Sequence, residues 1–357
     1  MNFYTLLQYD VKSLKQLIKN ASNQKEKYHY LFALISKDFL CVLFCFLFVT
    51  LFSIIFGSIN STAGVMILLA ILSTRFIDFD YNIQHNYIAV LLIFFIEAIG
   101  PHFSQLFSLP IGFIINILSL LVIVILSCYK VDYGHHFTFV LGYILLWGSD
   151  VNGHDYILRC LGLMTGAIII IAIMFHQHRN KQYETSIHHV INEFFQDTKR
   201  TRWQLQLCSL IALTMLIGSY FHYPKTSWIC FTCLSLSCIE VSLHHFKCLK
   251  RAPYVIVGCI IFILMMLVLP SYYLPYVGII GGLCVGVCAS YEWQTAFNCL
   301  GALAVTVSLF GVGGAIILRI LSNIIGTILT FVYLHLFHYI FDVLVSSKFT
   351  KNTMINN

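Results

Sequence analysis

Residues 108–129 read SLPIGFIINILSLLVIVILSCY, a run of 22 residues without a charged side chain. An α-helix rises about 1.5 Å per residue, so about 20 consecutive apolar residues cross the hydrocarbon core of a bilayer. The run therefore predicts a membrane-spanning helix. Similar runs recur from Phe39 almost to the C-terminus, so we expect many helices of this kind.

The composition supports the same conclusion for the whole chain. Hydrophobic residues make up 59% of it and charged residues only 10%, whereas soluble domains have about 45–50% apolar and about 25% charged residues. A soluble fold of 357 residues cannot bury so much apolar surface. We therefore predict an all-α, polytopic integral membrane protein.

The apolar segments suggest two halves with six segments in each. They fall near 36–57, 61–75, 87–100, 108–129, 135–149, 155–176, 204–222, 226–243, 253–270, 272–290, 294–310 and 313–338. We expect about 12 transmembrane helices, arranged as a first six-helix repeat over 34–176 and a second over 204–340.

Three polar segments complete the expected organisation. Residues 1–33 carry Leu7, Val11, Leu14 and Ile18 at helical spacing with lysines on the other face, as in an amphipathic helix on an anionic membrane surface; a disordered tail is the alternative. Residues 177–203 predict a charged, cytoplasmic connecting helix. Residues 341–357 form a tail.

The distribution of positive charge predicts the orientation, because cytoplasmic loops are enriched in lysine and arginine. An even number of spans per half and a cytoplasmic N-terminus place most basic loop residues inside, with Lys225 as the exception. We expect a multi-pass protein of the cell membrane with both termini cytoplasmic. The residues that set this orientation are Lys130, Lys247, Lys250, Arg251, Lys348 and Lys351.

The last segments of the two halves align without a gap. Ile157-Leu-Arg159-Cys-Leu, with Gly166 seven residues after the arginine, corresponds to Ile317-Leu-Arg319-Ile-Leu, with Gly326 seven after. Six helices per repeat give both halves the same orientation, so the repeats are expected to be parallel. Small residues such as Gly166 and Gly326 predict close helix packing.

Two interpretations of the arginines stay open. Arg159 and Arg319 either reach for headgroups and structural partners, or face a cavity and attract anions, since charged residues within spans are costly and usually functional.

At these positions the chain resembles the fusaric acid resistance and aromatic acid exporter (FUSC) superfamily, which includes plant aluminium-activated malate transporters. The resemblance rests on the doubled six-helix block, on the Arg-then-Gly pattern, and on Thr226-Ser-Trp228-Ile-Cys-Phe-Thr232 followed by Lys250-Arg251-Ala and Gly258. It covers the second half best, and the sizeable cytoplasmic domain of many relatives is missing from this sequence.

The resemblance implies the movement of small organic anions, aromatic or aliphatic carboxylates, across the membrane. Guanidinium groups suit carboxylates independently, because they stay charged and offer paired donors. We therefore expect substrate binding at Arg159, Arg319, Asn323, Trp228 and Thr232.

Glu97 and Glu240 are the candidate proton-coupling groups. Each lies inside or at the end of a predicted span, and an apolar setting favours the neutral acid, so such a carboxyl exchanges protons near working pH. The sequence has no phosphate-binding loop motif for ATP.

Other classes of function compete with transport. Paired histidines lack the clusters that a membrane di-iron site requires, so we expect no metal and no cofactor. Gly153-His154-Asp155 is the one group that favours a membrane transferase. A scaffold or accessory protein of envelope assembly, with envelope partners or as a homodimer, is the main alternative. No basic stripe with exposed aromatic residues points to nucleic acid.

Overall fold

The computed structural model describes residues 2–196 and 198–355, and their regular secondary structure is entirely helical. Residue 1 of the predicted N-terminal segment, residue 197 of the predicted connecting helix and residues 356–357 of the predicted tail lie outside the described residues. The chain forms two compact units, each from two separate stretches. Unit 1 comprises Met1–Leu51 and Ser242–Ile324, and unit 2 comprises Phe52–Val241 and Ile325–Asn357.

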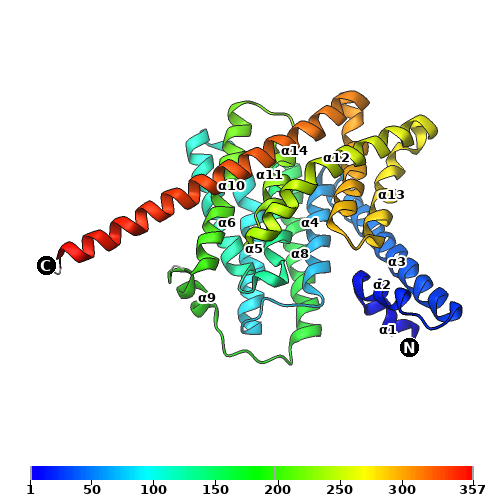
Figure 1. Cartoon of the computed structure of the whole chain (residues 1–357), viewed down its shortest axis with the longest axis horizontal. Helices are drawn as coiled ribbons and strands as arrows, with labels where there is room; N and C mark the ends of the chain where they lie inside the picture. Colours follow the sequence, from blue (N-terminus) through cyan, green and yellow to red (C-terminus); the bar gives the residue numbers. More distant parts are fainter. Residues whose placement is uncertain (1, 197, 356–357) are drawn as a thin grey trace. The chain divides into compact units, whose positions relative to one another are not determined.

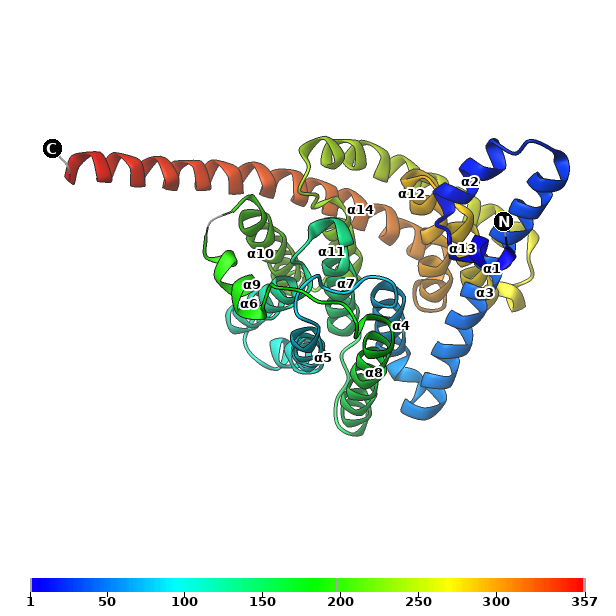
Figure 2. The ribbon, with the colours of Figure 1, turned by 90° about the horizontal axis from the view of Figure 1, so that it is seen from below.

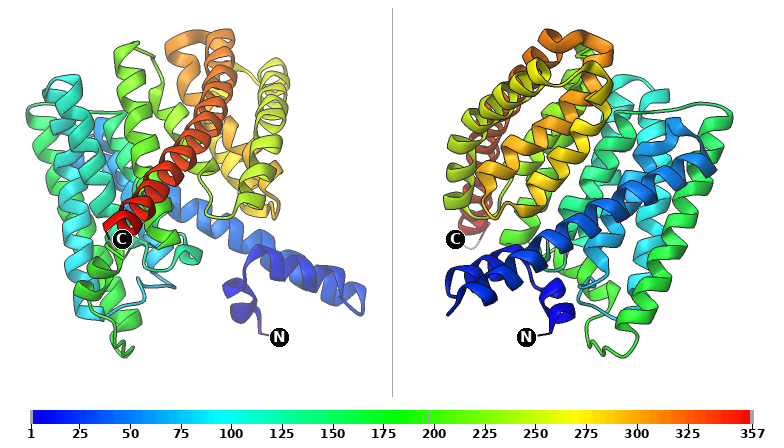
Figure 3. Two further views of the ribbon diagram at one scale, coloured as in Figure 1. Left: turned by 60° about the vertical axis from the view of Figure 1, so that its left-hand side comes forward. Right: turned by 90° about the vertical axis from the view of Figure 1, so that its right-hand side faces the viewer.

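Unit 1 combines the N-terminal helices with helices from late in the chain. Its elements are α1 (Phe3–Gln8), α2 (Val11–Lys19), α12 (Val241–Val268), η3 (Ser271–Tyr273), α13 (Leu274–Val287), most of α3 (Gln24–Phe56) and the first part of α14 (Tyr291–Ile355). Figure 3 shows α12 and α13, in yellow tones, beside the orange first part of α14.

Two apolar clusters hold unit 1 together. One joins α12, α13 and α14 around the fully buried Phe262, Val277 and Leu303. The other joins the short N-terminal helices to α3 through Leu14 and Leu34. The expected amphipathic character of residues 11–19 is visible here, since Leu14 is buried while the neighbouring Lys15 is exposed.

Unit 2 is a helix bundle built mainly from the middle of the chain. Its elements are η1 (Ser58–Asn60), α4 (Ser61–Thr74), α5 (Ile83–Leu106), α6 (Leu109–Ser127), η2 (Val131–Tyr133), α7 (His135–Trp147), α8 (His154–His178), α9 (Ile187–Phe194), α10 (Lys199–Tyr220), α11 (Thr226–Leu236) and the remaining parts of α3 and α14. Helices α5, α6, α8 and α10 run side by side (Figure 1).

Helix α7 occupies the interior of this bundle. It contacts α4, α5, α6 and α11, and Figure 2 views these helices roughly along their lengths. Phe139, Tyr143 and Ile144 of α7 are fully buried. A short helix surrounded on several sides explains why this segment is both apolar and shorter than its neighbours.

Seven described helices are long and apolar enough to cross a membrane, and four further apolar helices are shorter. By length and composition, these are the helices of a multi-pass membrane protein. The seven are α3, α5, α6, α8, α10, α12 and α14, and the shorter ones are α4 with η1, α7, α11 and α13. The expected twelve spans and the two repeats stay predictions.

Each predicted apolar segment is largely helical, and the boundary between the last two coincides with a break in α14. Gly311 has a φ of 68° and a ψ of 172° inside this helix. Side chains disfavour a positive φ, so glycine is the residue that best tolerates the break. The predicted connecting helix over 177–203 is shorter in the structure, where α9 covers only Ile187–Phe194.

The glycines of the repeated motif both lie at helix contacts of unit 2. A Cβ atom on Gly166 of α8 would lie 2.5 Å from the Ile67 Cγ1 atom of α4. A Cβ atom on Gly326 of α14 would lie 2.6 Å from the Thr232 Cβ atom of α11. Each glycine thus permits close approach to a short helix.

We expect Gly166→Ala to destabilise the protein by about 1–3 kcal/mol, because the added methyl group overpacks the contact with Ile67. Thermal unfolding in detergent measures the loss. Gly313→Ala is the matched control, since a Cβ atom there meets no heavy atom within 4 Å. The double variant Gly166→Ala with Ile67→Ala should lose less than the sum of the single variants; additive losses would contradict this packing.

Candidate functional site

Buried polar side chains connect α5, α6 and α7 inside unit 2. Tyr143 of α7 is fully buried, and its hydroxyl donates to the Asn116 Oδ1 atom of α6 at 2.8 Å. Gly100 of α5 makes room for the ring, because a Cβ atom there would lie 2.9 Å from the Tyr143 Cε2 atom. The phenol is therefore held between α5 and α6.

Glu97 lies one helical turn before Gly100 on α5 and is only 1% exposed. Its carboxyl group points at α7, since a Cβ atom on Gly142 would lie 3.1 Å from the Glu97 Oε1 atom. Neither carboxyl oxygen has a hydrogen-bond partner among the described residues. An ionised carboxylate in such a place is costly, so Glu97 is suited to hold a proton.

A pocket of about 510 Å³ opens at the end of unit 2 where α10 turns into α11. Asn116, the acceptor of the Tyr143 hydroxyl, belongs to its lining, which contains Lys225 and no acidic residue. The polar and aromatic side chains of the lining include Ser104, Gln105, Asn116, Trp147, Ser219, His222, Tyr223, Lys225, Thr226 and Ser227. The pocket is thus linked through Asn116 and Tyr143 to the neighbourhood of Glu97.

Arg159 of α8 is buried, with 2% of its surface exposed. Its Nε donates to the Asn60 Oδ1 atom at 3.0 Å, and the Asn60 Nδ2 donates to the carbonyl groups of Phe56 and Asp155. Its Nη2 has no hydrogen-bond partner among the described residues. Arg159 is therefore held inside the bundle, where Asn60 takes part of its hydrogen-bonding capacity, and it does not line the pocket.

Arg319 and Asn323 lie in unit 1 and are both buried. The Arg251 Nε donates to the Asn323 Oδ1 atom at 3.0 Å, and the Asn323 Nδ2 donates to the Arg319 carbonyl at 2.8 Å. Unit 1 thus brings these two predicted residues together with Arg251, which the sequence singled out for the orientation of the chain and for a family pattern but not as a site residue.

The remaining predicted site residues occupy two different settings. Trp228 and Thr232 are buried on α11 in unit 2, where Thr232 contacts the position of Gly326. Glu240 is exposed in the bend between α11 and α12. Of the two predicted coupling groups, only Glu97 is therefore buried within a helix.

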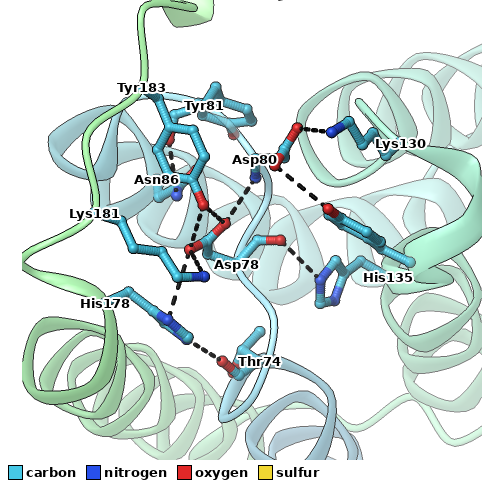
Figure 4. Close-up of polar contacts among 11 residues, drawn as sticks. Thr74, Asp78, Asp80, Tyr81, Asn86, Lys130, His135, His178, Lys181 and Tyr183 are labelled. Carbon is cyan, nitrogen blue, oxygen red and sulfur yellow. Dashed lines mark hydrogen bonds and ion pairs between the residues drawn. The ribbon is translucent and has the colours of Figure 1, made fainter.

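A second polar cluster lies beside the C-terminal ends of α4 and α8 (Figure 4). Asp78, in the loop between α4 and α5, is 1% exposed. It accepts from the Lys181 Nζ at 2.9 Å and from the Tyr183 hydroxyl at 2.8 Å, and the His178 Nδ1 lies 3.6 Å away. These three partners follow one another near the end of α8, so one carboxylate fixes the segment that leaves this helix.

The same loop also contacts the segment before α7. Asp80 pairs with Lys130, and His135 lies with its Nε2 atom 3.2 Å from the Asp78 carbonyl. Figure 4 shows His135 and Lys130 on the opposite side of the loop from Lys181. Three segments that are distant in sequence therefore meet at Asp78 and Asp80.

The environment of Asp78 favours its charged form. Burial alone would raise the pKa of this carboxyl, but hydrogen bonds from Lys181, Tyr183 and the Asp80 amide, together with the Lys181 charge, lower the pKa below its usual value. A group with a lowered pKa stabilises the fold above its ordinary pKa and loses that contribution as pH falls.

The sequence pattern did not predict this cluster. The sequence signal for it was weak. Asp78 and Asp80 lie in a loop that the positive-inside rule places on the cytoplasmic side, where the basic loop residues are also expected. The pairing of Asp78 with Lys181 spans more than 100 residues of sequence, and no local pattern encodes such a contact. Among the described residues, no group of three or more His, Cys, Asp or Glu side chains is placed to hold a metal ion.

We expect Asp78→Asn to lower stability by about 1–3 kcal/mol, the cost of losing hydrogen bonds to a charged acceptor. The Lys181 side chain is 44% exposed, so solvent screens its share. Thermal unfolding in detergent measures the loss, with Asp132→Asn, an exposed acid of the neighbouring loop, as control.

The pH dependence provides a second measurement. The difference in stability between wild type and Asp78→Asn should be constant around neutral pH. It should shrink as pH falls below the ordinary carboxyl pKa of 3.8. A difference that stays constant into acid would show that the charge of Asp78 does not stabilise the fold.

Comparisons with known proteins do not identify a family for this chain. No family model, no curated protein and no solved structure matches it. The resemblance to the FUSC superfamily therefore rests on the quoted residues alone. Within the described residues, the buried Glu97 and the polar pocket of the same unit are the features that bear most directly on function.

Proposed function

We propose that this protein is a proton-coupled membrane transporter that exports small organic anions, aromatic or aliphatic carboxylates. In this proposal it lies in the cell membrane as two parallel six-helix repeats with both termini cytoplasmic. The observation that supports it best is that unit 2 contains both the buried Glu97 and a polar pocket whose lining contains no acidic residue.

The pocket supports an anionic substrate. Lys225 and His222 lie in its lining without a neighbouring carboxylate, while Ser, Thr, Asn and Gln side chains add hydrogen-bonding groups. Ligand sites combine apolar and aromatic surface with a few polar groups that set orientation. Trp147 and Tyr223 supply aromatic surface in the same lining, which fits an aromatic or aliphatic carboxylate.

Glu97 supports coupling to protons. Ionisable residues within apolar spans are rare and usually mark ion or substrate pathways. Among the described residues, the Glu97 carboxyl oxygens have no hydrogen-bond partner, and Tyr143, the neighbour of Gly142, donates to Asn116 of the pocket lining. The polar groups between the pocket and α7 thus extend from Asn116 to Tyr143, next to Gly142, which faces the Glu97 carboxyl group.

The glycine contacts support the internal repeat. Gly166 on the last helix of the first half packs against α4, and Gly326 on the last helix of the second half packs against α11. Helices α4 and α11 are each the second apolar segment of their half. Equivalent glycines thus contact equivalent helices, as expected of two copies of one unit.

Proteoliposomes loaded with radiolabelled carboxylates test the proposal. A pH gradient should drive wild-type flux, whereas Glu97→Gln, which mimics the protonated acid, should abolish the response to the gradient while leaving substrate exchange. Glu240→Gln should behave as wild type, because that residue is exposed in a bend. Gradient-driven flux that survives Glu97→Gln would exclude Glu97 as the coupling group.

The pocket is tested separately by Lys225→Gln. Losing one charged contact of about 1 kcal/mol should raise the KM for carboxylates about fivefold. The KM values of the variants Arg159→Ala and Arg319→Ala test whether the buried arginines also bind substrate. No carboxylate flux above empty vesicles across a broad panel would reject transport and favour the assembly scaffold.

A further inference from the structure

Unit 1 contains a pocket of about 540 Å³ that the transport proposal does not use. It lies between the surface helix α2, the helix α3 and the helix α13. Asp38 and Lys15 are its only charged lining residues, and the rest of the lining is apolar or thiol. The lining consists of Lys15, Ile35, Asp38, Phe39, Leu283, Cys284, Val287, Cys288 and Phe297.

Asp38 is a buried carboxyl group without a protein partner. It is 8% exposed, and no described residue forms a hydrogen bond or ion pair with it, Lys15 included. Its position is set by Gly286 of α13, where a Cβ atom would overlap the Asp38 Oδ1 atom. A cation with N–H donors offsets the loss of water for a carboxylate held in such an apolar pocket.

Part of the pocket lining is exposed apolar surface on a helix suited to a membrane. Ile35 and Phe39 of α3 are 53% and 55% exposed, and α3 is one of the helices long and apolar enough to cross a membrane. Lys15 of α2 is exposed and belongs to the same lining. The pocket therefore combines exposed apolar side chains with one acidic and one basic group.

We propose that this pocket binds a phospholipid whose headgroup contains a primary ammonium and a phosphate, as in phosphatidylethanolamine. The ammonium donates to the Asp38 carboxylate, and the phosphate accepts from the Lys15 ammonium. The acyl chains lie along Ile35 and Phe39. The proposal is independent of transport, because its residues belong to unit 1 and none of them lines the pocket beside Asn116.

The charges of the pocket discriminate among common lipids. A primary ammonium has three N–H donors, as in lysine, whereas the quaternary ammonium of phosphatidylcholine has none. Phosphatidylglycerol carries the same phosphate but no cation, so its headgroup leaves the charge of Asp38 uncompensated, which is unfavourable. We therefore expect the order phosphatidylethanolamine, phosphatidylcholine, phosphatidylglycerol.

Native mass spectrometry of the full-length protein in detergent tests this order. Titration with the three lipids, matched in acyl chains, should show wild type binding phosphatidylethanolamine about tenfold more tightly than phosphatidylcholine, the gain expected from a charge-assisted hydrogen bond. Asp38→Asn should remove this preference. Glu26→Gln, which neutralises an exposed acid on the same helix, should retain it.

Lys15→Gln provides the complementary variant, and its exposed position leaves folding undisturbed. This variant should bind both phosphatidylethanolamine and phosphatidylcholine more weakly, because both lipids contain the phosphate. The ratio of their two affinities should stay the same. Equal binding of the two lipids by wild type, a preference for phosphatidylglycerol, or a preference that persists in Asp38→Asn would overturn the proposal. If Asp38→Asn fails to fold, the wild-type lipid order and Lys15→Gln still decide.

Discussion

Inside a bundle of apolar helices there is no water to satisfy polar groups, so each buried donor and acceptor needs a partner from the chain itself. Asn60 meets this requirement for Arg159 by accepting from its Nε while donating to two backbone carbonyl groups. Asn323 in unit 1 likewise accepts from the Arg251 Nε and donates to the Arg319 carbonyl group. An asparagine beside a buried arginine is thus the device that lets both units contain a guanidinium group in their interiors.

The two proposals rest on carboxyl groups for which the protein provides no such partner. Glu97 is buried in unit 2, which also contains a polar pocket, and a bound proton removes the cost of burying its charge. Asp38 lies beside an apolar pocket with a lysine at its edge, where a bulkier cation fits. In the two proposals, therefore, one carboxyl group binds a proton and the other binds a lipid ammonium group, because their surroundings differ.

Local pattern was enough to predict the helices but not their contacts. The apolar runs predicted where most of the chain is helical, and a segment boundary near 310–313 falls at the break at Gly311, because span length and hydrophobicity act within one helix. Arg159 and Gly166 were found by comparing the two halves. The partner of Arg159 is 99 residues away, and that of Asp78 is more distant still, so neither was visible. Glu240 was misplaced near a span because the helix ends at Leu236.

The order of the units along the chain has a consequence for biogenesis. Unit 1 is discontinuous, with α3 made early and α13 and α14 made late. At synthesis rates of about 5–20 residues per second, α3 waits tens of seconds in the membrane before its neighbours exist. During that interval Asp38 has neither Gly286 beneath it nor a finished pocket around it. Until then only water or a lipid headgroup solvates this carboxyl group, and its pocket is complete only after Phe297 has been made.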